Sequence, residues 1–317
     1  MEQGASGFGT VQGAPRLPEG FSATFQSRLV EVDGVRLHAV VGGHGPPLLL
    51  ISGWPQCWYE WRLVMPRLAQ EYRVVAADPR GVGLSDKPEG GYDSGSLAGE
   101  FVDLMETLGH RRFALMGHDV GMWTSYALAS DFPDRVERLV LVDATIPGLA
   151  PSIPLFSADA VNDTTWHFGF NRLHNLNERL VTGREELLLR DQFATKGATP
   201  TTMPEYAVRF YVDMLRRSPQ ALHASFNFYR AIEEIIEQND QRKRRKLRMP
   251  VLSVGGEHGQ SDRVRSALEP VVVDLTHVTI TDSGHYVPEE QPRQLLDHLL
   301  PFLRSGSSPG DGRRTNQ

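Results

Sequence analysis

The feature that most constrains this chain is the pentapeptide Gly-His-Asp-Val-Gly at residues 117–121. An apolar, strand-like stretch at 112–116 precedes it, and a helical pattern at 122–130 follows it. Glycines on both sides of a central residue relieve crowding in a sharp strand-to-helix turn, which lifts the central side chain, Asp119, out of the sheet. The pattern predicts a nucleophile elbow, with a glycine-rich turn carrying an exposed aspartate as the structural alternative.

Aspartate at the centre of such an elbow indicates covalent chemistry on carbon. The Asp119 carboxylate can attack an electrophilic carbon and form an alkyl–enzyme ester, which water then cleaves. Esterases and lipases place serine here and attack acyl groups. Aspartate favours substrates with an electrophilic sp3 carbon, such as epoxides and alkyl halides.

Apolar runs alternate with helical patterns along most of the chain. The predicted strands are 28–32, 36–41, 47–51, 73–77, 112–116, 136–142, 250–254 and 271–280. Alternation of this kind implies parallel pairing, with helices on both faces of one sheet. The alternation stops after Asp143, and the pattern is mostly helical until Leu247. The sequence therefore predicts an α/β fold with a mostly parallel eight-stranded sheet and an inserted helical cap, or lid.

These patterns divide the chain into five parts. We expect a flexible N-terminal lead, two core parts that flank the helical cap, and a disordered tail. Their bounds are 1–18 for the lead, 19–144 and 248–304 for the core, 145–247 for the cap and 305–317 for the tail.

Composition excludes several classes of partner and site. The net charge of −6 argues against a general nucleic-acid binder, and the basic run 242–246 is interpreted as the solvated end of a helix. The single cysteine, Cys57, cannot form an intramolecular disulfide and fits a reducing compartment. No run has the length of a membrane span, and the N-terminus lacks the pattern of a secretory signal. We therefore expect a cytoplasmic protein without a membrane partner.

A histidine follows the last predicted strand in the motif Ser-Gly-His-Tyr at 283–286. The glycine before it lets the loop turn sharply, so that the imidazole of His285 can face the elbow. Because the ordinary pKa of histidine lies near neutrality, His285 suits the task of activating water. His285 is the predicted general base.

Cleavage of an ester on Asp119 creates a tetrahedral oxyanion, which two backbone N–H groups should hold. One predicted donor is the N–H of Val120, the residue after the nucleophile. The other is the N–H of Trp54, in the motif Ser-Gly-Trp-Pro that follows the strand 47–51. A tight strand-to-helix turn is the structural interpretation of this motif, and both interpretations can hold together.

Four motifs together resemble the epoxide hydrolases of the α/β-hydrolase fold. They are Ser-Gly-Trp-Pro at 52–55, Asp-Pro-Arg-Gly-Val-Gly-Leu-Ser at 78–85, the elbow at 117–121 and Ser-Gly-His at 283–285. The resemblance spans about residues 20–303 and implies the α/β-hydrolase fold. The family usually has His-Gly-x-Pro in the first motif, so Ser52 is a departure that affects loop support more than chemistry.

Within that family the chain is most similar to the bacterial subfamily typified by the cystic-fibrosis-transporter inhibitory factor. The motifs at 58–61, 166–168 and 225–230 carry this similarity. The subfamily protonates the epoxide oxygen with a His/Tyr pair in the lid, which the resemblance carries over to His167 and Tyr229. Without the resemblance, both side chains would be interpreted as core packing.

The resemblance also bears on the acid that orients the base. Relatives often place it after the strand 251–254, where this chain has Gly-Gly-Glu-His-Gly. The subfamily moves the acid, commonly glutamate, to the end of the preceding core strand, and Asp143 stands there. Asp143 is the predicted acid although its side chain is shorter, with Glu257 and Asp262 as alternatives.

The sequence thus predicts an epoxide hydrolase that converts a small apolar epoxide and water to a vicinal diol. No cofactor or metal is expected, because no group of residues has metal-ligand spacing and no loop has phosphate-binding form. A dehalogenase with the same nucleophile is the main alternative, but Val120, Met122 and Trp123 supply neither the tryptophan nor the arginines that such enzymes carry after the nucleophile. A non-catalytic ligand-binding module is less favoured. The sequence is compatible with a homodimer and does not determine the oligomeric state.

Overall fold

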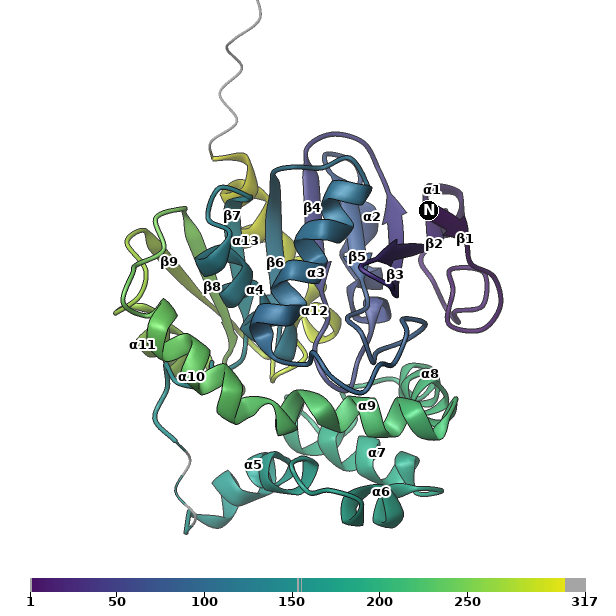
Figure 1. Ribbon diagram of the computed structural model, residues 1–317, viewed down its shortest axis with the longest axis vertical. Helices are drawn as coiled ribbons and strands as arrows, with labels where there is room; N and C mark the ends of the chain where they lie inside the picture. Colours follow the sequence, from purple (N-terminus) through teal and green to yellow (C-terminus); the bar gives the residue numbers. More distant parts are fainter. Residues whose placement is uncertain (1, 153, 155, 306–317) are drawn as a thin grey trace, which may run out of the picture.

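The computed structural model describes residues 2–152, 154 and 156–305. A sheet runs through this part in the order β1-β2-β3-β5-β4-β6-β7-β8-β9 (Figure 1). The strands are β1 (Glu2–Gly4), β2 (Phe25–Val32), β3 (Val35–Gly42), β4 (Pro47–Ile51), β5 (Arg73–Ala77), β6 (Phe113–His118), β7 (Val136–Val142), β8 (Val251–Gly256) and β9 (Leu275–Ile280). Pairs from β5 to β9 are parallel, and pairs from β1 to β5 are antiparallel. The mostly parallel sheet is confirmed, with nine strands in place of the predicted eight.

The three central strands bring their carboxyl ends to one edge of the sheet. Strands β4, β6 and β7 are neighbours in the sheet, and β6 is buried along its whole length. Their register places Ile51 opposite Gly117, and His118 opposite Val142. The residues that come directly after these strands therefore meet at that edge, which is where α/β sheets bind their ligands.

The described helices cover both faces of the sheet. They are α1 (Phe21–Thr24), the 3-10 helix η1 (Trp58–Leu63), α2 (Met65–Leu68), α3 (Ser94–Thr107), α4 (Val120–Asp131), α5 (Asp159–Asn171), α6 (Leu176–Val181), α7 (Glu185–Lys196), α8 (Glu205–Arg216), α9 (Pro219–Arg230), α10 (Ile232–Arg242), α11 (Ser261–Leu268), α12 (Val287–Glu290) and α13 (Pro292–Arg304). Figure 1 shows α3 and α4 in front of the sheet and α13 behind it. None of the described helices is long and apolar enough to cross a membrane.

One predicted helix and one predicted strand differ from the structure in extent. The sequence pattern at 58–69 predicts one continuous helix, whereas these residues form η1 and then α2, which has Pro66 in its first turn. Proline has no N–H to continue the hydrogen bonds of a preceding turn, so the helix restarts there. The strand predicted at 271–280 begins only at Leu275, after an isolated bridge between Leu247 and Val272.

Six helices, α5 to α10, lie between β7 and β8 in the chain, and we call them the cap helices. In Figure 1, α5 to α9 lie below the sheet, and α10 leads back towards the core. Helix α10 is tied to the core because the Arg242 guanidinium pairs with Asp131 at 2.6 Å and Asn239 donates to the Pro147 carbonyl at 2.8 Å. The domain bounds given above stay a prediction.

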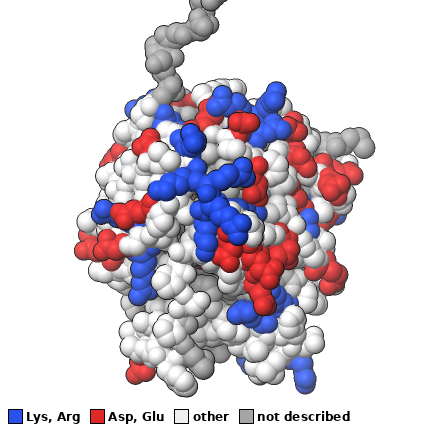
Figure 2. All heavy atoms as spheres, turned by 60° about the vertical axis from the view of Figure 1, so that its left-hand side comes forward, with Lys and Arg blue, Asp and Glu red and all other residues white. Residues whose placement is uncertain are grey.

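The basic run 242–246 is only partly solvated, in contrast to the expectation. Arg242 is buried because it pairs with Asp131, whereas residues 243–246 are exposed. Figure 2 views the side of the molecule where α10 and α11 lie, and lysine and arginine side chains gather there beside aspartates and glutamates. This mixture of charges is typical of a solvated helix end.

The N-terminal segment packs on the core, so the prediction of a flexible lead is wrong for the described residues. Strand β1 pairs with β2, and the Trp58 indole donates to the Gly9 carbonyl at 2.8 Å. Val11 is buried, and its N–H donates to the Ser27 hydroxyl at 3.0 Å. An edge strand such as β2 has unpaired backbone groups, which favours pairing with the N-terminal segment. The segment has no hydrophobic periodicity from which this pairing could be predicted. The predicted tail, except Ser305, lies outside the described residues.

Candidate active site

Asp119 stands at the turn between β6 and α4 with a φ of 51° and a ψ of −120°. Positive φ is uncommon for residues other than glycine and marks a strained turn. A Cβ at position 117 would lie 2.3 Å from the Gly121 carbonyl oxygen, and one at position 121 would lie 2.3 Å from that of Ile51. Both positions therefore require glycine, and the turn has the form of the predicted elbow.

The loop after β4 supplies a hydrogen-bond donor to the Asp119 carboxylate. The Trp54 N–H donates to Oδ1 of Asp119 at 3.0 Å, and the Trp54–Pro55 peptide bond is cis. A Cβ at Gly53 would lie 2.5 Å from that of Asp119, so the loop can approach the elbow only with glycine there. Val120 begins α4, where N–H groups of the first turn have no acceptor within the helix. The Trp54 N–H thus contacts the nucleophile, and the Val120 N–H follows it directly in the chain.

The structure places His285 between two carboxylates. Its Nδ1 lies 2.9 Å from Oδ2 of Asp143, and its Nε2 lies 3.3 Å from Oδ2 of Asp119. The shorter side chain of Asp143 reaches the imidazole because the residue follows β7 directly, in a backbone conformation with a φ of 44°. The three predicted residues of the triad are therefore in contact.

The loop after β8 holds the Asp143 carboxylate instead of supplying a carboxylate of its own. Its Oδ1 accepts the backbone N–H groups of Gly256 at 2.8 Å and of Gln260 at 2.9 Å. A Cβ at Gly259 would lie 2.5 Å from Oδ2 of Asp143, which explains the glycines of this loop.

The two alternative acids, Glu257 and Asp262, are both exposed. Glu257 accepts the Asp282 N–H at 3.0 Å, and Asp262 is exposed in the first turn of α11. Glu257, His258 and Asp282 bring ligand atoms within 4.8 Å of one another, a grouping that sequence spacing did not reveal. All three are exposed, and an exposed acidic group of this kind does not by itself indicate a metal site.

The contacts of His285 set the charges of the site. Burial disfavours a charge on this imidazole, but the hydrogen bonds and charges of Asp119 and Asp143 outweigh burial and raise the pKa of His285 to about 9. Burial also opposes ionisation of Asp119. The hydrogen bond and charge of His285 outweigh burial, so the pKa of Asp119 lies well below its usual range. The resting site is therefore a carboxylate paired with an imidazolium at neutral pH.

His118, beside the nucleophile, points away from the reacting atoms. Its Nδ1 lies 3.1 Å from Oε2 of Glu60, and its Nε2 lies 2.9 Å from the His285 carbonyl oxygen. Both side chains are fully buried, and burial raises the pKa of Glu60 to about 7 against the opposing charge of His118. This pair supports the loop that carries the base.

The cap helices bring His167 of α5 and Tyr229 of α9 to the nucleophile edge. Trp54 stacks on His167, with ring centroids 5.7 Å apart and an interplanar angle of 4°. Tyr229 stands edge-on to Trp54 at 5.4 Å and to His167 at 5.5 Å. Burial and the charge of Asp119 raise the pKa of Tyr229 well above its usual value, so the phenol keeps its proton. The two residues that the resemblance carried over thus lie together.

The structure adds a residue that sequence reasoning missed, Lys196. Its Nζ lies 3.1 Å from Nε2 of His167, and its backbone carbonyl accepts the His285 N–H at 2.9 Å. A Cβ at Gly284 would lie 2.4 Å from that carbonyl oxygen, so glycine lets the end of α7 dock on the base loop. A single lysine at the end of a helix has no motif around it, and only tertiary contacts reveal its place.

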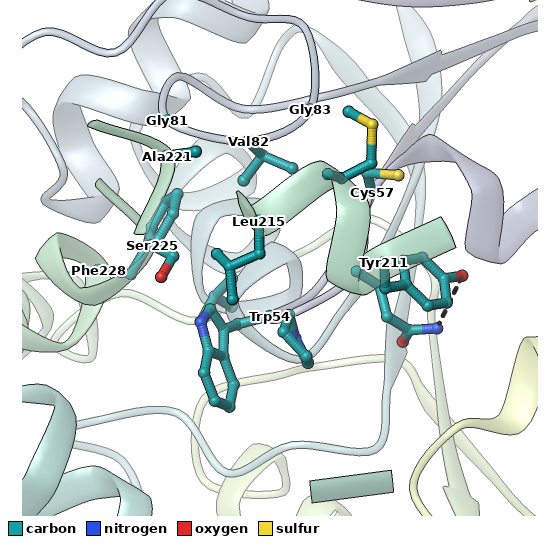
Figure 3. Close-up of a pocket in the computed structure, with 14 residues that line it drawn as sticks. Trp54, Cys57, Gly81, Val82, Gly83, Tyr211, Leu215, Ala221, Ser225 and Phe228 are labelled. Carbon is teal, nitrogen blue, oxygen red and sulfur yellow. Dashed lines mark hydrogen bonds between the residues drawn. The ribbon is translucent and has the colours of Figure 1, made fainter. Parts of the chain in front are cut away.

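A small cavity of about 30 Å³ is lined in part by Trp54 and Val120, the residues of the two predicted oxyanion donors (Figure 3). It lies between the loops that carry Trp54 and Val82 on the core side and α8 and α9 on the cap side. Its lining is mostly apolar and includes Trp54, Val82, Val120, Met214, Leu215 and Phe228. Such a lining favours apolar groups, although the volume is far smaller than that of a typical ligand pocket.

Comparison with known proteins agrees with the motifs and the geometry. The family described as alpha/beta hydrolase fold matches residues 46–292. A soluble epoxide hydrolase from Corynebacterium sp. (strain C12) is 33% identical over 277 residues, which are 86% of this chain and 95% of the relative. A fluoroacetate dehalogenase from Burkholderia sp. is 34% identical over 304 residues, which are 90% of this chain and 95% of the relative.

Solved structures extend this agreement to three dimensions. The crystal structure of Cfl2 from Burkholderia cenocepacia superposes with a TM-score of 0.85 at 40% identity, covering 89% of this chain and 96% of that one. The resemblance to epoxide hydrolases that the motifs carry is confirmed by these relatives. The chain belongs to the α/β-hydrolase fold family.

Proposed function

We propose that this protein is an epoxide hydrolase that converts a small apolar epoxide to a vicinal diol through an ester on Asp119. One observation carries the proposal. The carboxylate of Asp119 accepts the Trp54 N–H on one oxygen and faces His285 with the other, while a protonated phenol and an imidazole of the cap pack on the Trp54 ring. This arrangement supplies a nucleophile, a base and proton donors for a leaving oxygen.

In the first step, Oδ2 of Asp119 attacks a ring carbon while Oδ1 stays bonded to the Trp54 N–H. The carbon–oxygen bond of the ring breaks, and its electron pair stays on the oxygen. Tyr229 and the adjoining His167–Lys196 pair face that oxygen and supply its proton. Because the pKa of Asp119 is held low, the nucleophile is ionised throughout the neutral range.

In the second step, the neutral ester no longer stabilises the charge of His285. The pKa of His285 then falls from its resting value of about 9, so the imidazolium releases its proton to solvent and the neutral imidazole can take a proton from water. Asp143 keeps the ring oriented during this transfer. The water oxygen bonds to the ester carbon, and the N–H groups of Trp54 and Val120 hold the oxyanion. The bond between the ester carbon and the alkyl oxygen then breaks, the second proton of the water passes to the departing oxygen, and the diol leaves a restored Asp119 carboxylate.

A dehalogenase is the second candidate, favoured by the Burkholderia relative and by one feature of the site. The indole N–H of Trp54 is buried without a hydrogen-bond partner among the described residues and could face a halide. Other donors are engaged, because the Trp123 indole donates to the Thr145 carbonyl at 2.9 Å. Val120 follows the nucleophile without a side-chain donor, which makes the epoxide reaction the better match.

The test measures diol formation from a panel of aliphatic and aryl epoxides beside halide release from 1-bromobutane and fluoroacetate. We expect diol from the wild-type protein and none from Asp119→Ser, together with a mass increase of one substrate on the wild-type chain during single turnover. Halide release without diol would assign the protein to the dehalogenases. Binding of epoxide without either product would indicate a ligand-binding module.

A further inference from the structure

Lys196 is an ammonium group placed inside the catalytic site by the end of α7. The residue is partly buried, and its Nζ lies 3.1 Å from Nε2 of His167. The ammonium also stands 5.6 Å from the ring centroid of Trp54, a distance at which a cation is attracted by an aromatic face. The Trp54 ring and the His167 nitrogen therefore hold the ammonium group in place. Trp54 is also the residue whose backbone N–H donates to the Asp119 carboxylate.

The contact between Lys196 and His167 decides which of them can give a proton. An ammonium group has three donors and no acceptor, so Nε2 of His167 must accept. The proton of a neutral His167 then resides on Nδ1, which is buried and has no hydrogen-bond partner among the described residues. An imidazolium here would place two positive charges 3.1 Å apart. His167 in this arrangement has no Nε2 proton to donate.

We propose that Lys196 is the acid that, with Tyr229, protonates the ring oxygen, and that His167 positions its ammonium group. This role rests on the proposed epoxide hydrolysis. As the ring carbon–oxygen bond breaks, one Nζ–H bond of Lys196 breaks and an O–H bond forms, leaving a hydroxyl on the ester and a neutral amine. The proton that the His285 imidazolium releases to solvent before hydrolysis is replaced by the one it takes from water, and the Lys196 amine regains its proton from solvent.

Electrostatics fit an acid at this position. Burial lowers the pKa of Lys196 to about 8, although the charges of Asp119 and Asp191 oppose the shift. Burial and the charge of Lys196 hold the pKa of His167 well below its usual value, so the imidazole is neutral at physiological pH. A general acid works best when its pKa lies near the working pH, which is true of Lys196 and not of His167.

The experiment follows ester formation and ester hydrolysis separately, by rapid quench and intact-protein mass after mixing excess enzyme with 1,2-epoxyhexane. For Lys196→Met we expect ester formation to slow about 100-fold, and ester hydrolysis to stay within about threefold of wild type. His167→Gln keeps an oxygen that accepts from Lys196, and we expect a loss of only about tenfold in ester formation. Lys243→Met, at an exposed lysine on the end of α10, is the matched control.

The pH dependence provides a readout that a merely structural lysine would not affect. In the wild-type protein, ester formation should fall above pH 8, where Lys196 loses its proton. Lys196→Met should lack this fall. Lys196→Arg is a second variant that serves if Lys196→Met does not fold, because arginine keeps the charge and a donor. In Lys196→Arg, the fall in the rate of ester formation should move beyond about pH 11, because arginine does not deprotonate in that range.

Two results would overturn the role of Lys196. One is a loss of 100-fold or more in His167→Gln with near wild-type ester formation in Lys196→Met, which would return the acid to His167. The other is a fall above pH 8 that persists in Lys196→Arg. A wild-type protein that forms neither ester nor diol would instead overturn the proposed function, and the inference with it.

Discussion

The core edge and the cap edge of the site are built by different means. At the core edge, backbone geometry positions every group, since glycines admit the loops and N–H groups hold the carboxylates of Asp119 and Asp143. At the cap edge, His167, Tyr229 and Lys196 are positioned by ring faces and by one contact between side-chain nitrogens. The core edge therefore appears in the sequence as short motifs with a steric reason, whereas His167 and Tyr229 of the cap edge are indicated only by the family resemblance and Lys196 only by packing.

This difference also separates the two steps of the proposed reaction. The base, its acid and the oxyanion donors all come from the core and act on the ester. The proton donors for the ring oxygen come from the cap. Apart from the nucleophile Asp119, substitutions on the core edge should therefore slow ester hydrolysis or destabilise the fold, and substitutions on the cap edge should slow ester formation alone.

The largest effect is expected for Asp143→Asn. An amide cannot stabilise the imidazolium or hold the correct tautomer of His285, so turnover should fall by about 10⁴-fold and the ester should accumulate. Intact-protein mass during turnover measures that accumulation. Glu257→Gln is the control and should stay near wild type, because Glu257 is exposed and bonded to the Asp282 N–H. If Glu257→Gln were the more damaged variant, the acid would be misassigned.

Next comes Gly121→Ala, which tests the backbone construction of the core edge. The new Cβ would lie 2.3 Å from the Ile51 carbonyl oxygen, which cannot move without shifting β4. We expect the free energy of unfolding to fall by about 3 kcal/mol in denaturant titrations. Gly99→Ala in α3 is the matched control, because its Cβ meets nothing within 4 Å and alanine favours a helix. Equal stability of the two variants would contradict the steric explanation.

The charge arrangement of the core edge predicts a pH-dependent stability. The pKa of His285 is about 9 in the folded protein and about 6.5 in the unfolded chain. Its contribution is therefore complete below pH 6.5 and is lost as the pH rises through 9, by a total of about 3 kcal/mol. Unfolding titrations from pH 6 to 10 measure it. A His285→Gln variant should lose this dependence, and an identical slope in both proteins would refute it.

The smallest effect is expected on the cap edge, for Tyr229→Phe. One of two proton donors is removed while the ring packing stays, so ester formation should slow by roughly 30-fold, about 2 kcal/mol. Ester hydrolysis and the melting temperature should change little. Rapid-quench measurement of both steps tests this prediction. Slower ester hydrolysis with unchanged ester formation would contradict the assignment of the cap edge to ester formation.

Most of the sheet and the nucleophile edge could be predicted from the sequence. All eight predicted strands are present in the sheet. Central parallel strands are continuous apolar runs, whereas the antiparallel β2 and β3 form a hairpin. Strand β1 could not be predicted, since its three residues, Glu2–Gly4, become a strand only by pairing with β2. The choice of Asp143 over Glu257 likewise needed the family resemblance, because both follow predicted strands.

By itself, then, the sequence determined the elbow, the base loop and the alternation of strands and helices that carries them. These features depend on local steric requirements, such as glycine at 117 and 121, which neighbouring residues express directly. Only the tertiary structure decided which groups of the cap edge carry a proton. Lys196 approaches His167 from a helix 29 residues further along the chain, and that contact alone determines which nitrogen carries a proton. A protonation state set by packing between distant helices leaves no pattern in the sequence.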